Sequence, residues 1–459
     1  MSGVGLDTLA EVATALGLAE HDAGVDAERS VGEIVTDTRR LGPGALFVAL
    51  TGERFDGHDF IAQAREAGAV AAVVERRVDD PLPQLVVADA RLALGLLGRA
   101  RRRAWGGPLV AVTGNSGKTT VKQMLGALLA RRGETLATRG NLNNDIGAPL
   151  TLLELCAEHR QAVVELGANH LGEIAWTASL AEPRVAVITN VTGAHVGEFG
   201  GPGRIAQAKA EILMSLPGDG VAVLNRDDRY FASWASLAAP REVLDFAVEG
   251  PARLRAETLV CDPLGRYAFT LFHDDHELGR VQLALLGRHN VANALAAAGA
   301  ALAMGLAPND VLAGLETVAP MPGRLSVAEG VNGARLLDDT YNANPGAVKA
   351  ALDLLASLPG PRWCLLGAMG ELGEASASLH EAVGRHAREL GIDFLGTLGE
   401  AARPASRAFG DGGCHFDDRE ALTRHVLHHL PPGASVLVKG SRSAGMEAVV
   451  SALCPDASR

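Results

Sequence analysis

Apolar runs alternate with amphipathic stretches along most of the chain. In the first hundred residues, short apolar runs are separated by helical stretches such as 59–68, which predicts a small α/β unit. Further along, strand-like Val/Ile/Ala runs again alternate with helical segments. Continuous apolar runs of this kind are typical of parallel strands covered on both faces, so we predict a parallel sheet between helices. The expected strands are 44–50, 70–75 and 84–89 in the first unit, and 109–114, 162–167, 185–191 and 221–225 in the second.

Two joints divide this pattern into three parts. A charged segment ending in Gly and Pro spans 99–108, and a Pro/Gly segment spans 318–324 after an Ala-rich helix expected over 290–305. Beyond the second joint, strand-then-glycine units at 363–370, 393–399 and 435–441 predict another α/β domain. We therefore expect an α/β protein with domains over 1–105, 106–318 and 319–459. We interpret the basic run at 99–103 as the solvated end of a helix.

Composition excludes several classes of function. The chain of 459 residues is 47% hydrophobic and 21% charged, with a formal net charge of −12, which argues against a general nucleic-acid or membrane-surface binder. Its five cysteines form no C-x-x-C pair, which argues against a disulfide framework and a zinc site. The N-terminus lacks the pattern of a secretory leader, and no apolar run reaches membrane-spanning length. We expect a cytoplasmic protein that is not inserted in a membrane.

A glycine-rich turn at 114–120 follows the apolar run at 109–113 and precedes a predicted helix. Backbone N–H groups of such a turn can surround phosphate oxygens, a lysine adds positive charge, and the adjacent hydroxyl can hold Mg²⁺. The spacing departs from the usual P-loop, because Val112 occupies the place of its first glycine. We still predict a nucleotide site, formed by Gly114, Asn115, Ser116, Gly117, Lys118, Thr119 and Thr120.

Three further residues extend this prediction. Glu165 ends one expected strand, His195 follows the next, and Lys209 lies on the helix after that. Taken alone, a glutamate at a strand end more often caps a helix, a histidine in a loop more often has no role in a site, and a lysine on a helix is more often solvated. A carboxylate and an imidazole at successive strand ends of the same domain nevertheless form a reasonable Mg²⁺ shell.

Several motifs together resemble the Mur ligase family, whose members are ATP-dependent amide-forming ligases of peptidoglycan precursor synthesis. That family shares the shortened phosphate turn, which accounts for Val112. Three of the motifs, at 140–147, 165–176 and 338–345, are most similar to the branch that joins D-alanyl-D-alanine to UDP-N-acetylmuramoyl-tripeptide. The matching segments are 36–60, 141–147, 165–174, 286–297, 322–324, 338–345 and 438–442.

The resemblance implies a division of labour among the domains. The first domain would bind the UDP end of the substrate, the central P-loop domain ATP, and the Rossmann-like last domain the incoming dipeptide. ATP and Mg²⁺ would be the cofactors, with Thr119, Glu165 and His195 as metal ligands. Lys209 matches a lysine that is carbamylated in sister ligases. Further ATP contacts would be Asn290, Asn293, Arg324, Asp339, Tyr341 and Asn342. Substrate contacts would be Thr36, Asp37, Thr38, Arg39, Phe47, Ala49, Asn141, Asn143, Asn144, Lys439, Ser441 and Arg442.

Alternatives stay open at this stage. The Asn- and Asp-rich motifs are also good turn formers without any ligand. Another ligase of the superfamily, a P-loop ATPase without ligation and an inactive scaffold are the competing functions. We expect a monomer without a nucleic-acid partner. The chain departs from the family pattern at Ala368, where an acidic residue is expected, which puts in doubt a role for that position in domain closure.

Overall fold

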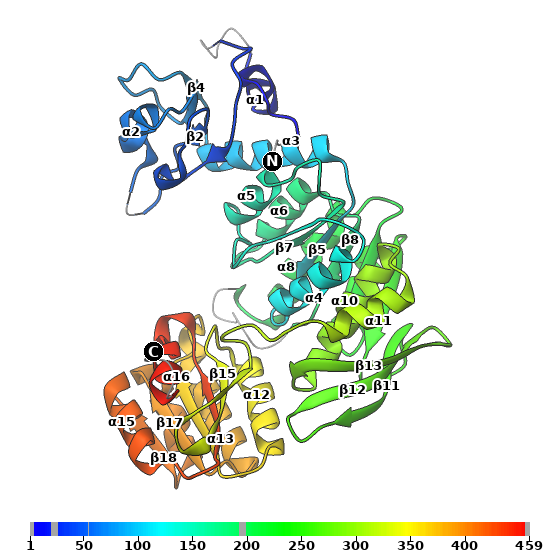
Figure 1. Cartoon of the computed structure of the whole chain (residues 1–459), viewed down its shortest axis with the longest axis vertical. Coiled ribbons are helices and arrows are strands. Elements are labelled where there is room, and N and C mark those ends of the chain that lie inside the picture. Colours follow the sequence, from blue (N-terminus) through cyan, green and yellow to red (C-terminus); the bar gives the residue numbers. More distant parts are fainter. Residues whose placement is uncertain (1–3, 20–25, 54, 192–198, 455–459) are drawn as a thin grey trace.

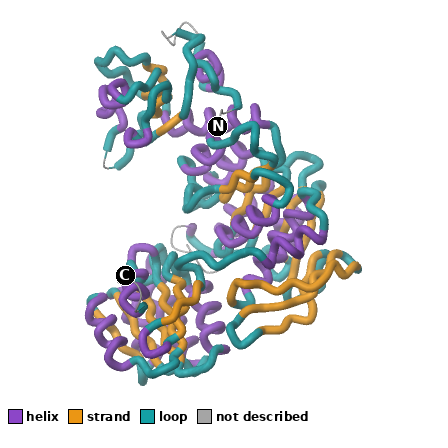
Figure 2. The backbone as a smooth tube through the Cα atoms, in the orientation of Figure 1, coloured by secondary structure: helices purple, strands orange, loops and turns teal. Residues whose placement is uncertain are grey.

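Three β-sheets organise the computed structural model, which describes residues 4–19, 26–53, 55–191 and 199–454 (Figure 1; Figure 2). The first sheet has four parallel strands in the order β1-β2-β3-β4, so the predicted small α/β unit is confirmed. Its elements are β1 (Ile34–Val35), β2 (Leu46–Val48), β3 (Ala71–Val74) and β4 (Gln84–Val86), with α1 (Leu9–Ala15), η1 (Thr38–Arg40), η2 (Gly57–Phe60), α2 (Ile61–Glu66) and α3 (Ala90–Trp105).

The central sheet has nine strands in the order β13-β12-β11-β10-β9-β8-β5-β7-β6. The strands from β6 to β11 are parallel, and among them β5, β7, β8 and β9 are the strands that the apolar runs predict, whereas β12 and β13 are antiparallel to their neighbours. Over 280–285, β13 alternates buried residues with more exposed ones, as a strand with one solvated face does, whereas β12 contains buried and half-buried residues. The strands are β5 (Leu109–Thr113), β6 (Thr135–Ala137), β7 (Gln161–Glu165), β8 (Val185–Ile188), β9 (Val221–Asn225), β10 (Glu242–Ala247), β11 (Leu254–Cys261), β12 (Arg266–His273) and β13 (His276–Leu286).

Helices cover both faces of this sheet. One apolar core lies between the sheet and α4, α10 and α11, and a second lies under α5, α6, α8 and α9. The helices are α4 (Lys118–Ala130), α5 (Gly147–Leu153), α6 (Glu173–Ala181), α8 (Pro202–Ala210), η3 (Glu211–Ser215), α9 (Phe231–Ala238), α10 (His289–Ala303) and α11 (Pro308–Glu316). The three layers leave the carboxyl ends of the parallel strands open to a ligand.

The third sheet repeats the three-layer plan, with the strand order β14-β15-β19-β16-β17-β18. Only β14 is antiparallel to its neighbour, and separate apolar cores fill the two faces. Its strands are β14 (Ser326–Glu329), β15 (Arg335–Asp339), β16 (Arg362–Gly367), β17 (Phe394–Leu398), β18 (Gly413–Phe416) and β19 (Ser435–Lys439). Its helices are η4 (Val331–Gly333), α12 (Pro345–Ser357), η5 (Gly373–Ala375), α13 (Ser376–Glu389), η6 (Glu400–Ala402), α14 (Arg403–Phe409), α15 (Arg419–His429), η7 (Arg442–Ala444) and α16 (Glu447–Leu453).

Helix α3 belongs to two parts of the molecule. On one side Leu94 and Leu97 join the core of the first sheet, and on the other its glycines allow close approach to the central domain. A Cβ atom on Gly98 would lie 3.0 Å from the Cα atom of Pro149, and one on Gly95 would lie 2.6 Å from the Trp176 ring. The helix is therefore packed between the N-terminal sheet and helices α5 and α6.

The arginines of α3 correct the interpretation of 99–103 as a solvated helix end. Arg101 and Arg102 are buried, while Arg103 is exposed. Arg102 donates from Nε to the Ala181 carbonyl at 2.7 Å and from Nη2 to the Glu182 carbonyl at 3.0 Å. These carbonyls lie at the C-terminus of α6, where a cation is favourable. The arginine thus ties α3 to the central domain.

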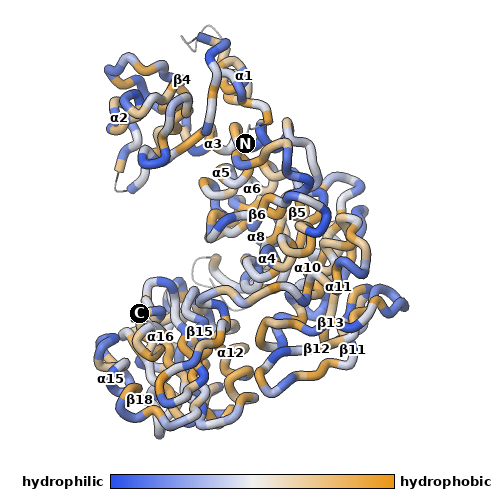
Figure 3. The backbone as a smooth tube through the Cα atoms, in the orientation of Figure 1, coloured by the Kyte–Doolittle hydropathy of each residue, from blue (hydrophilic) through white to orange (hydrophobic). Residues whose placement is uncertain are grey.

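In the part of the chain that the structure describes, no helix combines the length and the apolarity needed to span a membrane. Hydrophobic and hydrophilic residues are interspersed along the backbone (Figure 3).

Replacing Arg102 with Ala should destabilise the packing of α3 on α6. Two hydrogen bonds from a buried cation to helix-end carbonyls are lost, at a cost of about 2 kcal/mol. Arg103→Ala is the matched control, because it removes only an exposed ion pair with Glu182 and should cost under about 0.5 kcal/mol. Hydrogen–deuterium exchange of the α3 and α6 amides reads both variants. Equal protection in the two variants would contradict the role of Arg102.

Candidate functional site

The glycine-rich turn connects β5 to α4, as predicted, and its glycines have steric reasons. Gly114 has φ +145°, and a Cβ atom there would lie 1.9 Å from Thr189 Oγ1. Gly117 has φ +81°, and a Cβ atom there would lie 2.3 Å from Asn293 Oδ1. Side chains at these two positions would be strained and would also collide with neighbouring groups. The turn therefore needs glycine at both places.

The end of β8 holds this turn in place. The Asn115 and Ser116 N–H groups donate to the backbone oxygen and the Oδ1 atom of Asn190, at 2.9 and 3.0 Å. Thr189 Oγ1 donates to the Ser116 carbonyl at 2.6 Å. No described side chain caps the N-terminus of α4, so the N–H groups of its first turn face an incoming anion with the positive end of the helix dipole. The geometry suits a phosphate group.

Lys118 folds back over the turn. Its Nζ atom donates to the Gly114 carbonyl at 2.9 Å and to the Asn115 carbonyl at 3.2 Å. Burial lowers the pKa of its ammonium group, and the nearby Glu165 carboxylate offsets part of that change. A cation held by carbonyl oxygens in a poorly solvated place gains strongly from a phosphate anion.

Glu165 is buried at the end of β7 and collects donors from several segments. Thr119 Oγ1 donates to its Oε2 atom at 3.0 Å, and Asn143 Nδ2 donates to Oε1 at 2.9 Å. Lys122 Nζ lies 3.3 Å from Oε2. Two adjacent ligands of an octahedral ion with bonds of about 2.1 Å lie about 3.0 Å apart, so Thr119 and Glu165 fit a Mg²⁺ site. The structure thus brings together two of the predicted metal ligands.

Lys209 of α8 is buried near the same edge. Burial is the main cause that lowers its pKa to about 7, and repulsion from Lys118 lowers it further. Its Nζ atom lies 5.6 Å from the centre of the Phe199 ring. An amine with a pKa this low is substantially uncharged near neutral pH. His195, the other predicted metal ligand, lies outside the described residues.

The two predicted asparagines of α10 are paired with each other. Asn293 Nδ2 donates to Asn290 Oδ1 at 2.8 Å, and Asn290 Nδ2 donates to the Leu286 carbonyl at 2.7 Å. Both side chains are buried, and Asn293 Oδ1 lies beside Gly117. The pair therefore stands against the back of the phosphate turn.

Side chains beyond residue 319 also reach the phosphate turn. Arg324 Nη2 donates to Thr119 Oγ1 at 3.0 Å, and its guanidinium lies 4.0 Å from the centre of the Tyr341 ring. Asn344 Nδ2 donates to Ser116 Oγ at 3.2 Å while its Oδ1 atom caps α12. Two side chains from the C-terminal part thus contact the turn directly.

Other predicted residues of the third sheet gather at the ends of β15 and β19. Lys439 is buried, forms an ion pair with Asp339 and donates to the Asn342 carbonyl at 3.0 Å. Ser441 Oγ donates to the Ala368 carbonyl at 2.6 Å, and Arg442 beside it is exposed. Ser441 and Ala368 also line a cavity of about 740 Å³. The remaining lining residues are Leu398, Gly399, Asp417, Asp418, Arg419, Glu420, Ser443 and Ala444.

The predicted substrate residues of the first sheet lie away from the phosphate turn, at the other end of the molecule from the third sheet (Figure 1). Arg39 forms a 2.6 Å ion pair with Asp37 and lowers the pKa of that carboxyl to about 2. Thr36 and Thr38 flank Asp37 and are half-buried. The Phe47 and Ala49 side chains are buried in the core, so only their backbone atoms can face a ligand.

The asparagine-rich segment between β6 and α5 connects to Glu165 through Asn143. Asn144 Oδ1 accepts from the Gly147 N–H at 2.8 Å, at the start of α5. Asn141 and Asn144 are exposed. The segment therefore exposes Asn141 and Asn144 close to Glu165, the predicted metal ligand.

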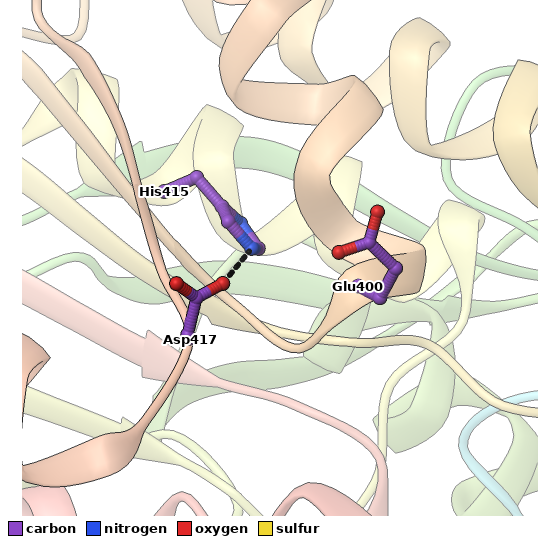
Figure 4. A group of neighbouring side chains, drawn as sticks. All are labelled: Glu400, His415 and Asp417. Carbon is purple, nitrogen blue, oxygen red and sulfur yellow. Dashed lines mark ion pairs between the residues drawn. The ribbon is translucent and has the colours of Figure 1, made fainter.

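A separate group of potential metal ligands lies on the third domain. Glu400, His415 and Asp417 have donor atoms within 4.8 Å of one another (Figure 4). Arg403 already bridges the two carboxylates, at 2.8 Å from Glu400 and 3.1 Å from Asp417. The guanidinium thus supplies the positive charge that these carboxylates need.

The sequence reasoning missed two residues of the site, Lys122 and Asn344. Lys122 follows Lys118 by one helical turn, and a lysine among the apolar positions of α4 was the signal that could have identified it. Asn344 stands directly before Pro345, an arrangement typical of a helix start. Its contact with Ser116 spans the two domains and has no local signal.

Comparison with known proteins places the whole arrangement in one family. Residues 30–97 match the catalytic domain of the Mur ligase family, 112–301 the Mur ligase middle domain, and 323–442 the Mur ligase glutamate ligase domain. The UDP-N-acetylmuramoyl-tripeptide–D-alanyl-D-alanine ligase of Escherichia coli K12 is 44% identical over 429 residues, covering 93% of this chain and 94% of the relative.

Solved structures agree over nearly the full length. A crystal structure of MurF from Acinetobacter baumannii superposes with a TM-score of 0.92 at 39% identity, covering 97% of this chain and 98% of that one. MurF ligase from Thermotoga maritima in complex with ADP superposes with a TM-score of 0.84 at 30% identity, covering 92% and 96%. With its three family domains in order and this degree of identity, the chain belongs to the Mur ligase family.

Proposed function

We propose that this chain is an ATP-dependent ligase that joins D-alanyl-D-alanine to the terminal carboxylate of UDP-N-acetylmuramoyl-tripeptide. The observation that carries the proposal is the position of Thr119. Its hydroxyl contacts both the Glu165 carboxylate of the central sheet and the Arg324 guanidinium of the C-terminal part. The Thr119 Oγ1 atom thus connects the phosphate turn, the predicted metal ligand Glu165 and an arginine from the C-terminal domain. The Escherichia coli relative bears the name of this activity.

Amide formation from a carboxylate requires activation, because hydroxide is a poor leaving group. The tripeptide carboxylate oxygen attacks the γ-phosphorus of ATP, the bond from that phosphorus to the β-γ bridging oxygen breaks, and ADP leaves. The dipeptide amine then attacks the acyl phosphate carbon, and phosphate and a proton are released. Positioning and charge neutralisation supply most of the catalysis in phosphoryl transfer.

The chain supplies these groups at the carboxyl edge of the central sheet. Lys118 holds the β- and γ-phosphates together with the N-terminus of α4, and Arg324 neutralises charge as the third domain closes. Thr119 and Glu165 would hold Mg²⁺, which would supply positive charge against the repulsion between the phosphates and the attacking carboxylate. His195 is the proposed ligand of a second metal ion. Asn290 and Asn293 address adenine, with Asp339, Tyr341 and Asn342 across the domain joint.

Lys209 is proposed to be carbamylated. Its unprotonated amine forms an N–C bond to CO₂, one C=O π bond becomes a carboxylate, and a proton passes to water. The buried position and the pKa of about 7 support this, because they keep the amine uncharged. The resulting anion suits the metal shell, whereas an ammonium group would repel it.

The remaining assignments complete the proposal. The domains are 1–105, 106–318 and 319–459, and the first binds UDP through Thr36, Asp37, Thr38 and Arg39 and the backbone of Phe47 and Ala49. Asn141, Asn143 and Asn144 contact the muramoyl-peptide. Lys439, Ser441 and Arg442 stand toward the phosphate or the dipeptide, near the 740 Å³ cavity. Closure of the domains excludes water from the acyl phosphate. The enzyme is proposed to act as a cytoplasmic monomer.

Phosphate release tests the reaction. With ATP and UDP-muramoyl-tripeptide, D-Ala-D-Ala should support rapid turnover, while single amino acids and reactions without an acceptor give only slow hydrolysis. The reason is that the acyl phosphate is protected from water until the amine attacks. Equal turnover with L-lysine or diaminopimelate, and none with the dipeptide, would contradict the proposed specificity for D-alanyl-D-alanine. Turnover independent of any acceptor would instead point to a simple ATPase.

Lys118→Ala should lower kcat/KM for ATP by roughly 10²–10³-fold, because a preorganised cation beside the transferring phosphate is lost. Binding of the UDP-muramoyl-peptide, measured by calorimetry, should change little. Lys349→Ala, on α12, serves as the control for loss of a lysine outside the phosphate turn. Full ligation activity in Lys118→Ala would remove the assigned role.

Lys209→Met should abolish ligation and yet stabilise the fold in CO₂-free buffer. The folded pKa of about 7 lies below the ordinary value of 10.5, so the unfolded chain binds more protons between these two pH values. The burial cost is therefore greatest at and below pH 7 and vanishes toward pH 10.5. Urea unfolding across this range measures the gain, which should shrink as the pH rises.

The same variant tests the modification. In ¹³CO₂, wild type and Lys349→Met should both show a carbamate ¹³C NMR signal that Lys209→Met lacks. A signal that persists without Lys209 would assign the carbamate elsewhere.

A further inference from the structure

Lys122 occupies a place in α4 where packing alone favours an apolar side chain. It is 4% exposed, and its neighbours Val121 and Leu125 belong to an apolar core. Burial lowers the pKa of its ammonium group, with the Glu165 carboxylate acting in the opposite direction. Burying a cation is unfavourable unless specific partners compensate for lost water, so the partners of Lys122 are informative.

Those partners come from two different segments. Lys122 Nζ lies 3.3 Å from Glu165 Oε2 and donates to the Gly140 carbonyl at 3.1 Å. Gly140 has φ +52°, a left-handed conformation that glycine adopts readily. Its carbonyl begins the asparagine-rich segment 140–144. The lysine therefore bridges the metal-type carboxylate and the backbone at the start of that segment.

A second link closes a ring. Asn143, from the same segment, donates to the other carboxylate oxygen of Glu165 at 2.9 Å. The Gly167 N–H donates to the Asn143 carbonyl at 2.8 Å, just beyond the end of β7. The segment is thus connected to Glu165 twice: at Gly140 through the Lys122 ammonium group, and at Asn143 through its side-chain amide.

We propose that Lys122 is a positioning residue of the ligase, which fixes segment 140–144 against Glu165 so that the muramoyl-peptide contacts and the metal-type carboxylate keep one geometry. This inference rests on the proposed function, because the segment is assigned there to the muramoyl-peptide. Lys122 acts through Glu165 and Gly140 and does not itself touch the substrate.

If Lys122 served only to stabilise the fold, its ammonium group would not be needed. An apolar residue of similar length would fill the same space, and Glu165 would keep hydrogen bonds from Thr119 and Asn143. No other contact described above would replace the hydrogen bond from Lys122 to the Gly140 carbonyl. Loss of the ammonium should therefore release the segment more than it disturbs the fold.

Substrate binding without metal or ATP provides the test. Calorimetry with UDP-muramoyl-tripeptide in EDTA should show about tenfold weaker binding for Lys122→Met, as supporting residues of a site commonly do when they are removed. Lys122→Arg, which keeps a cationic donor, should recover most of the affinity. ADP binding in EDTA should change by under about threefold in both variants, because contacts with Thr189 and Asn190, outside segment 140–144, hold the phosphate turn.

Steady-state kinetics should show the same difference between the UDP-peptide and the nucleotide. KM for the UDP-peptide should rise about tenfold in Lys122→Met while KM for ATP changes by under about threefold. Arg102→Met is the matched control: it also removes a buried cation bonded to carbonyls, but at the opposite, amino edge of the sheet. It should lower thermal stability without changing the KM of the UDP-peptide. If Lys122→Met does not fold, Lys122→Gln undergoes the same measurements.

Unchanged UDP-peptide affinity in the charge-removing variant would overturn the inference while the proposed function stands. An equal loss of ADP and UDP-peptide binding would also overturn it, since that pattern reports a general disturbance of the fold. Failure of the wild-type chain to bind the UDP-peptide would overturn the proposed function, and this inference with it.

Discussion

A carboxylate buried at the end of a central strand needs several hydrogen-bond donors, because charge removed from water is costly. Glu165 draws its donors from α4 through Thr119 and Lys122, and from the asparagine-rich segment through Asn143. Arg324 reaches the same cluster from the third domain through the Thr119 hydroxyl. The phosphate turn, the asparagine-rich segment and the domain joint are thus positioned relative to one buried charge.

The surplus of cations around this carboxylate explains how an acidic protein can receive a polyanion. The chain carries a formal charge of −12, yet Lys118, Lys122 and Arg324 gather at Glu165. Only five residues of the chain are lysines, and Lys209 also lies near this edge. Burial lowers the pKa of all three lysines. Local charge, and not net charge, decides which ligand such a site favours.

Local sequence patterns predicted the parts of this site that local forces determine. The two glycines of the turn, the strand before it and the hydroxyl after it belong to one short segment, and Glu165 could be placed because strand ends share an edge. The buried role of Arg102 could not be predicted, since its carbonyl partners lie about 80 residues away. The same holds for Lys122, whose partner Glu165 lies on another strand.

Strands β12 and β13 were missed for another reason. The prediction of the sheet used the continuous apolar runs of the neighbouring strands, and these runs give no indication that the sheet changes direction. Their pairing is set by hairpin turns at the sheet edge. Assignment of the UDP and dipeptide residues depends on family resemblance, because no residue in those segments has a geometry that alone requires a ligand.

The packing of α3 has a mechanical consequence. One apolar core contains side chains of the N-terminal sheet, of α3 and of α5, including Leu46, Leu94 and Leu150. Rotation of the N-terminal sheet against the central one would have to break this shared core. Across the joint at 318–324, Leu286 of β13 joins an apolar core of the third sheet, and Arg324 donates to Thr119. The N-terminal and central sheets are therefore coupled mechanically, so that a load on one is carried to the other through α3.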